Sequence, residues 1–217
     1  MLRHPALLIA AAAILCLSPA PTYAVVIIGN LGAADAGTGG TVGDIPGNPA
    51  FQEYAVSFTM PANDFTIDNI LLRLADPSVL DGTPDITLRA DAAGLPGAQL
   101  ATFNAPAPAL SGATQTHIFT PVGAITLNAN AAYWIHVGHV GPTGSYAWVD
   151  SAPSTNPSGL ATFGQYRVSS DDGSTFPTVS PNRLKFEVNA TLVPEPSAAL
   201  LLPLAILVPL LRHHRRR

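Results

Sequence analysis

The residues best suited to chemistry stand near the C-terminus, where Pro194, Glu195 and Pro196 precede an apolar run from Ala198 to Leu211. Proline disfavours helix in itself and in the residue before it, so we expect this tripeptide to be extended and exposed. The apolar run can leave water for lipid, which would hold the tripeptide at a membrane surface. An exposed peptide in that place is a substrate for a processing enzyme, so the predicted chemistry is cleavage of the chain near this motif.

A basic tail follows the apolar run and sets its expected orientation. Positive flanks resist translocation, so we expect the tail to stay in the cytoplasm while the tripeptide faces the other side. The arginines of the tail are Arg212, Arg215, Arg216 and Arg217. The run has only 14 residues, and at ~1.5 Å per helical residue it is shorter than the hydrocarbon core of ~30 Å. Flanking residues must enter the interface or the bilayer must thin locally. A plain anchor that is never cut is the alternative.

The order of motif, apolar run and terminal arginines resembles the PEP-CTERM sorting signal of Gram-negative bacteria. The resemblance covers the last 25 residues, 193–217. It implies a membrane enzyme of the exosortase type, which would recognise Pro-Glu-Pro and process the protein for the cell surface or the extracellular matrix. A sortase signal would need Leu-Pro-x-Thr-Gly, which the sequence lacks. A GPI signal normally ends in its apolar tail rather than in charged residues.

The N-terminus has the pattern of a secretory signal peptide. A short basic start precedes an apolar stretch from Ala6 to Leu17, and Thr22 and Ala24 are small residues at the two positions that a signal peptidase reads. We predict cleavage after Ala24. Cys16 admits a lipoprotein interpretation, but Leu15 stands before it where a lipobox has a small residue.

Composition excludes several classes of function for the exported part. Cys16 is the only cysteine, so the mature chain would have no disulfide framework, no cysteine nucleophile and no cysteine-based zinc site. Residues 25–194 carry 13 acidic and 5 basic side chains, a net charge near −8. Such a domain repels phosphate backbones, so nucleic acid is not expected as a partner.

Two histidines on one segment are the first candidate for metal binding. His136 and His139 are three residues apart, a spacing that places both on one face of a helix. Residues 133–140 read as a strand, however, and on a strand these two side chains point to opposite faces unless a bulge at Gly138 intervenes. We therefore predict one histidine packed inside, one exposed, and no shared metal. His117 reads as an outward-facing strand residue.

An acidic turn at Asp171, Asp172 and Gly173 is the candidate for calcium. Calcium takes six to eight oxygen ligands, usually from several segments, and only two adjacent carboxylates are visible here. A hairpin turn therefore explains the sequence better. The same interpretation applies to the carboxylates of Asp76, Asp81 and Asp85.

Aromatic residues offer a carbohydrate-binding platform as a further hypothesis. The residues concerned are Trp134, Tyr146, Trp148, Tyr166 and Phe176. Aromatic side chains also supply much of the buried area in a small sandwich, which is the competing interpretation. The sequence contains no nucleophile elbow, zinc-protease motif or phosphate loop. We therefore predict no catalytic residues, no cofactor and no metal.

The region between the two terminal segments predicts a single all-β domain. Glycine and proline separate short apolar runs throughout its 170 or so residues, as in a β-sandwich or jelly roll. Strands are expected at residues 25–28, 54–60, 65–74, 85–90, 99–104, 116–120, 124–127, 133–140, 146–149, 165–168 and 183–192. Alternation predicts that Ile70, Leu72 and Leu74 face inward. It predicts the same for Leu184, Phe186 and Val188, with Arg183, Lys185, Glu187 and Asn189 on a wet face. Residues 29–50 read as a long flexible loop.

The strand with Phe58, the Gly94–Gly97 turn and the Tyr133–Val137 strand together resemble the choice-of-anchor extracellular domains, over roughly residues 50–190. We thus predict a signal peptide at 1–24, an extracellular β-domain at 25–192 and a sorting signal with a transmembrane helix at 193–217. The predicted role is an exported structural protein of the cell surface or of an exopolysaccharide matrix. A carbohydrate-binding module with the same sorting signal is the alternative.

Overall fold

The computed structural model describes residues 23–45, 51–75, 83–104, 113–141 and 144–194. The chain divides into two compact units, Ala24–Leu192 on the one hand and Met1–Tyr23 with Val193–Arg217 on the other. Tyr23, Val193 and Pro194 are the described residues of the second unit. The fold below is that of Ala24–Leu192.

This unit is an all-β structure, and no helix occurs among its described residues. Its strands are β1 (Ala24–Gly29), β2 (Ala34–Gly43), β3 (Glu53–Thr59), β4 (Phe65–Ala75), β5 (Thr83–Asp91), β6 (Pro96–Asn104), β7 (Gln115–Pro121), β8 (Thr126–Leu127), β9 (Ala132–Val140), β10 (Ser145–Ala152), β11 (Ser158–Gly159), β12 (Thr162–Ser169), β13 (Thr178–Ser180) and β14 (Phe186–Leu192). The all-β prediction is confirmed, and every predicted strand overlaps an observed one.

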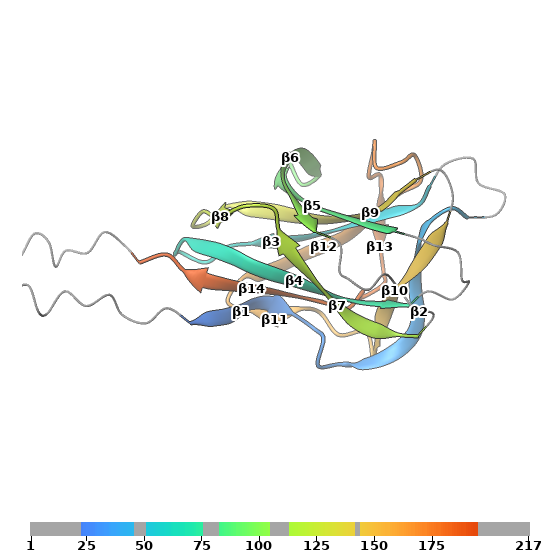
Figure 1. The fold of residues 1–217 in the computed structure, drawn as a ribbon, viewed down its shortest axis with the longest axis horizontal. Helices are drawn as coiled ribbons and strands as arrows, with labels where there is room; N and C mark the ends of the chain where they lie inside the picture. Colours follow the sequence, from blue (N-terminus) through green and yellow to red (C-terminus); the bar gives the residue numbers. More distant parts are fainter. Residues whose placement is uncertain (1–22, 46–50, 76–82, 105–112, 142–143, 195–217) are drawn as a thin grey trace, which may run out of the picture. The chain divides into compact units, whose positions relative to one another are not determined.

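The strands form a curled antiparallel sheet (Figure 1). Its order is β11-β1-β14-β4-β7-β6-β5-β9-β3-β12-β13, while β10 pairs with β2 and β4, and β8 pairs with β4. The turn from one layer to the other lies where β6 meets β7, which share only the pairs Phe103–Pro121 and Asn104–Thr120. Strands from both layers enclose one core, so the fold is sandwich-like.

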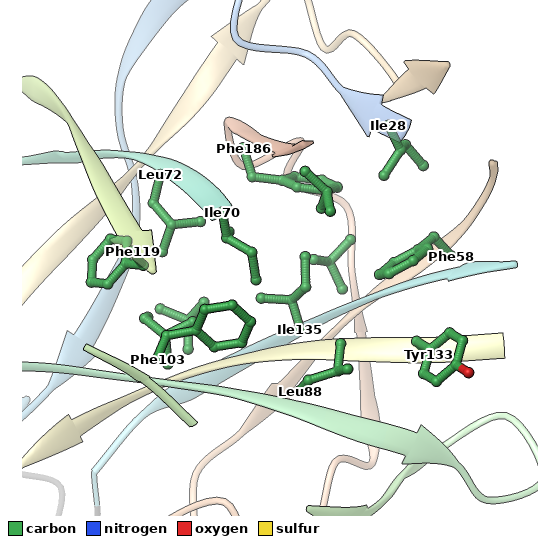
Figure 2. Packing of buried hydrophobic residues seen from close by; sticks show 14 of the residues in the cluster. Ile28, Phe58, Ile70, Leu72, Leu88, Phe103, Phe119, Tyr133, Ile135 and Phe186 are labelled. Carbon is green, nitrogen blue, oxygen red and sulfur yellow. The ribbon is translucent and has the colours of Figure 1, made fainter. Parts of the chain in front are cut away.

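The core follows the predicted alternation (Figure 2). Ile70, Leu72 and Leu74 of β4 are fully buried, and so are Leu184, Phe186 and Val188 at and before β14. They pack with Ile135, Leu88 and Phe58 of the opposite layer, among others. A period of two puts every second side chain of a strand on one face, which is why these assignments could be made from sequence.

Strand β2 corrects the prediction of a flexible loop at residues 29–50. It runs for ten residues and pairs with β10, from Ala34 opposite Ala152 to Gly43 opposite Ser145. Glycines permit this pairing, because a Cβ at Gly39 would clash with Asp150 and a Cβ at Gly40 would clash with Tyr54. The small residues therefore allow a close backbone approach rather than flexibility.

His117 corrects a second prediction. Its side chain is buried rather than outward, and Ile118, which the pattern would place inside, is exposed. Phe119 sets the phase of β7 because it packs in the main core, and His117 shares its face.

Candidate functional site

The predicted sorting motif begins directly after the last strand. β14 ends at Leu192, and Val193 and Pro194 follow without strand structure, with Pro194 exposed. The remaining predicted residues of this signal lie outside the described residues: Glu195, Pro196, Ala198, Leu211, Arg212, Arg215, Arg216 and Arg217. Of the predicted tripeptide, the structure therefore describes only Pro194. Glu195, Pro196 and the segments after them stay sequence-based predictions.

The predicted signal cleavage site lies at the first residue of the first strand. Ala24 is exposed and pairs with Thr191, while Val25 pairs with Ala190. Ala24 is thus adjacent in the sheet to the C-terminal end of β14, although 167 residues separate it from Thr191 in the sequence.

A buried polar cluster covers the outer face of the layer formed by β3, β5 and β9. Val56, Ile86 and Ile135 of these strands face the main core, so the alternate positions face away from it. There the Glu53 carboxylate lies 2.7 Å from His136 Nε2, with both side chains at least nine-tenths buried. This contact joins β3 to β9 across 83 residues of sequence.

The other ring nitrogen of His136 completes the cluster. Nδ1 lies 3.1 Å from Thr87 Oγ1 and 3.3 Å from Arg89 Nη2. A guanidinium can only donate, so Nδ1 is an acceptor and the proton is on Nε2, which donates to Glu53. Carboxylate, imidazole and hydroxyl therefore stand in the order of a nucleophilic triad. Thr87 is only 2% exposed, however, and the cluster joins β3, β5 and β9 in the interior of the domain.

The predicted acidic turn is the loop that covers this cluster. Asp171 accepts hydrogen bonds from Ser169 Oγ and from the backbone N–H and hydroxyl of Thr175. Asp172 accepts one from the Phe51 N–H. Gly173 has φ +69° and lies so close to the Glu53 carboxylate that a Cβ there would clash. The two carboxylates thus build a tight loop.

Phe176 closes the loop over the cluster. Its ring lies edge-on to His136, with centroids 5.6 Å apart, and it packs with Trp134 and Ala55 in a second small core. Trp134 Nε1 donates to Asp91 Oδ1, which ties the next turn to the same face. A turn and a loop therefore bury an outer sheet face that would otherwise be exposed.

His136 and His139 lie on opposite faces, as the strand prediction requires. β9 pairs with β5 from Val140 to Tyr133 without a register shift, so no bulge re-aims either ring. The expectation that one of them is exposed is wrong, because both are buried. His139 stacks edge-on against Phe51, and neither of its ring nitrogens has a hydrogen-bond partner among the described residues.

The aromatic residues considered for a carbohydrate platform are all buried. Trp134, Tyr146, Trp148, Tyr166 and Phe176 are each at most 4% exposed. The hydroxyls of Tyr146 and Tyr166 donate to the carbonyls of Gly138 and Leu184, and Trp148 Nε1 donates to that of Lys185. Burial raises the pKa of both tyrosines far above its usual value. These side chains form core contacts and no exposed stacking surface.

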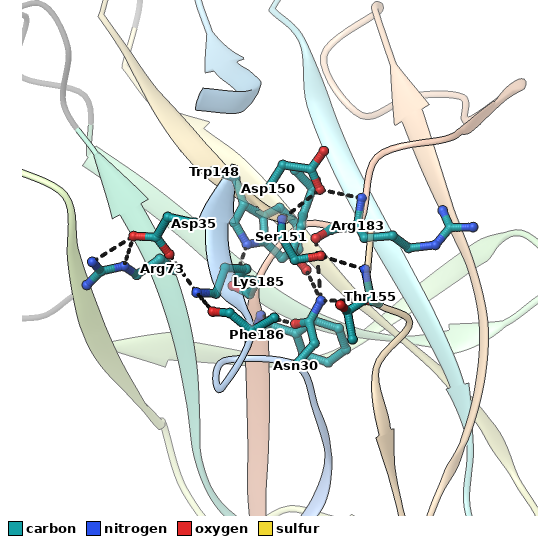
Figure 3. A network of polar contacts seen from close by, with 12 residues as sticks. Asn30, Asp35, Arg73, Trp148, Asp150, Ser151, Thr155, Arg183, Lys185 and Phe186 are labelled. Carbon is teal, nitrogen blue, oxygen red and sulfur yellow. Dashed lines mark hydrogen bonds and ion pairs between the residues drawn. The ribbon is translucent and has the colours of Figure 1, made fainter. Parts of the chain in front are cut away.

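A second polar network joins the N-terminal and C-terminal parts of the domain (Figure 3). Lys185 was expected on a wet face, yet it is only 3% exposed. Its Nζ donates to Asp35 Oδ1 at 2.5 Å and to the Ala33 carbonyl. Arg73 contacts the other carboxylate oxygen of Asp35 at 2.9 Å. Burial of Lys185 is possible because a carboxylate and a carbonyl accept hydrogen bonds from its ammonium group.

Acidification from pH 7 to pH 5 is expected to destabilise the domain through its buried histidines. Burial lowers the pKa of both His117 and His139, so the folded chain favours their neutral forms. In the unfolded chain both histidines take up a proton near the ordinary pKa of 6.5. The free energy of unfolding therefore decreases as the pH falls below 6.5, by at most ~1.4 kcal/mol per pH unit for each histidine. Thermal unfolding at several pH values measures this.

His117→Leu is the matched variant, since it removes one titrating group and keeps the site apolar. Its melting temperature should fall less than that of the natural chain between pH 7 and pH 5. Asp35 does not contribute in this window, because hydrogen bonds from Arg73 and Lys185 hold its pKa below 3.8. Equal slopes for the two proteins would refute the assignment to His117.

No protein-family model matches this chain, and no curated protein has significant similarity to it. Within the described residues, no helix is long and apolar enough to cross a membrane. The same residues contain no group of three or more His, Cys, Asp or Glu side chains arranged to hold a metal ion.

Proposed function

We propose that this chain is an exported structural protein of the cell surface or extracellular matrix, sorted through Pro194, Glu195 and Pro196. The observation that carries the proposal is the order of that tripeptide, an apolar run and terminal arginines. In this proposal signal peptidase removes residues 1–24, the apolar run holds the precursor in the membrane, and an enzyme of the exosortase type processes the motif.

The position of the motif supports this order of events. β14 ends at Leu192 and pairs on one side with β4 and on the other with β1, so the domain is complete before the motif begins. Pro194 is exposed. A processing enzyme could cut beyond this point without removing any strand, and the sandwich or jelly roll would stay folded after release.

The way residues 25–192 use their polar groups supports the proposed structural role. The carboxylate, imidazole and hydroxyl cluster is buried. The Asp171 carboxylate binds its own loop, and the Asp172 carboxylate accepts from the Phe51 N–H. The exopolysaccharide matrix is the proposed surrounding of the mature protein. A carbohydrate-binding role would need residues other than the five buried aromatics.

The intact mass of the mature protein from its own host tests the proposal. We expect a mass that lacks residues 1–24 and the residues after about Pro196. The measurement also reveals any group attached at the new C-terminus. A mature protein that retains Arg212–Arg217 would contradict the proposed processing and favour the uncut anchor.

A further inference from the structure

The first and last strands of the domain are neighbours, so the chain leaves it at one end in both directions. β1 and β14 are antiparallel, with Ala24 opposite Thr191 and Val26 opposite Asn189 (Figure 1). The predicted signal cleavage site and the predicted sorting motif therefore adjoin the same end of the sheet.

Exposed apolar side chains gather at this end. Val25 and Val26 of β1 are 37% and 44% exposed, Leu192 at the end of β14 is 42% exposed, and Leu160 is 55% exposed. Leu160 adjoins β1 because the next residue, Ala161, donates its N–H to the Ile27 carbonyl. We call these four residues the terminal patch. Val25 and Val26 point to opposite faces of β1, so the terminal patch includes both faces of this end of the sheet. Exposed apolar side chains gathered at one end of a domain mark a contact surface.

We propose that the terminal patch rests on the lipid bilayer that holds the apolar run of the precursor. This inference depends on the proposed function, in which residues 198–211 enter the membrane. Only five residues, 193–197, separate Leu192 from Ala198. At 3.3–3.6 Å per extended residue, Leu192 of the patch cannot be farther than roughly 20 Å along the chain from the start of the apolar run.

The short connection also makes a weak surface sufficient. A tether of this length gives the patch an effective concentration of roughly millimolar at the membrane surface. Four aliphatic side chains then need only a modest affinity for the boundary between headgroups and acyl chains. Contact there would hold the domain in one orientation while the enzyme reaches the motif beside it.

The patch does not suit addition of a strand from another chain. The β1 edge facing away from β14 is occupied at Ile28 and Gly29 by β11, and the Ile27 carbonyl accepts from Ala161. The remaining edge, Ala24–Val26, is shorter than the usual strand of about 5–6 residues. A lipid surface requires no backbone pairing and fits the side chains that are exposed.

Single-cysteine labelling of the full chain tests the contact. Cys16→Ser removes the only natural cysteine, and a cysteine at Leu160 or Val26 then carries an NBD fluorophore. Cysteines at Val140 and Val179, which are 55% and 54% exposed, are matched controls outside the patch. Leu204→Cys reports on the apolar run itself. The proteins are reconstituted into vesicles of phosphatidylethanolamine and phosphatidylglycerol, with or without doxyl-labelled lipid.

We expect labels at positions 26, 160 and 204 to shift to the blue and to lose intensity with doxyl lipid, while those at 140 and 179 do neither. If the label at 204 is quenched while those at 26 and 160 behave like the controls, the docking of the patch is overturned. The proposed membrane segment would still stand. A blue shift at 26 and 160 without quenching would mean a protein partner, such as a second copy, and would also overturn it. An unquenched label at 204 would overturn the membrane segment of the proposed function.

Discussion

Replacing Glu53 with alanine is expected to lower the free energy of unfolding by about 2–4 kcal/mol, because it leaves a buried imidazole N–H without an acceptor and opens a cavity. Glu53 accepts from His136 Nε2 at 2.7 Å, and Gly138 and Gly173 pack against its carboxylate. Alanine would leave both an orphaned N–H and a void under the Ser169–Thr178 loop. For a domain of this size the loss corresponds to a drop in melting temperature of roughly 4–16 °C.

Two variants make this prediction specific. Glu53→Gln keeps an oxygen that can accept from Nε2, so its loss should be smaller. Glu187→Ala removes a half-buried carboxylate from β14 whose partner is Asn189, and it should cost about 0.5 kcal/mol or less. In a double-mutant cycle with His136→Leu, the two substitutions together should cost less than their sum. A loss for Glu53→Ala no larger than for Glu187→Ala would show that the pair does not stabilise the fold.

The sequence predicted the strands because local patterns determine them. The alternation in 65–74 and 183–192 named the inward residues of β4 and β14 correctly, since burial on one face forces a period of two. The same logic kept His136 and His139 apart. Turn residues worked as well, because Asp172 and Gly173 both adopt the positive φ that such residues tolerate.

The sequence did not predict what depends on distant partners. β2 consists largely of glycine, alanine and threonine, and its strand character comes from pairing with β10, more than a hundred residues later. Lys185 follows the alternation of its strand, but only the approach of Asp35 and Ala33 makes its burial possible. His117 was assigned to the wrong face because the pattern of β7 allows two phases, and the core contact of Phe119 selects one.

The Glu53–His136 cluster was missed for the same reason. Its members come from β3, β5 and β9, and each alone reads as an ordinary polar residue on the wet face of a strand. One signal was present, since Trp134 and His136 share a face with Thr87 and Arg89 in register. An aromatic residue on a supposedly wet face indicates a covering loop, and the acidic turn was the segment available to form it.

Glu195→Ala is expected to abolish or strongly reduce processing in the native host while leaving the domain folded. Glu195 is the only charged residue of the tripeptide, so it offers the enzyme an ionic contact that the flanking prolines cannot supply. In the sequence it lies three residues beyond Leu192, the last residue of β14. The loss should therefore appear as uncut precursor in the membrane fraction and not as degraded protein.

Ser197→Ala is the matched control, because it changes a polar residue next to the motif and keeps Pro194, Glu195 and Pro196. Its processing should equal that of the natural chain. Both variants should unfold at the natural melting temperature, since residues after a strand end add little to the stability of a domain. Normal release of Glu195→Ala would show that processing does not depend on the Pro-Glu-Pro motif. The apolar run and its arginines would then act as a simple anchor, and the sorting assignment would have to be given up.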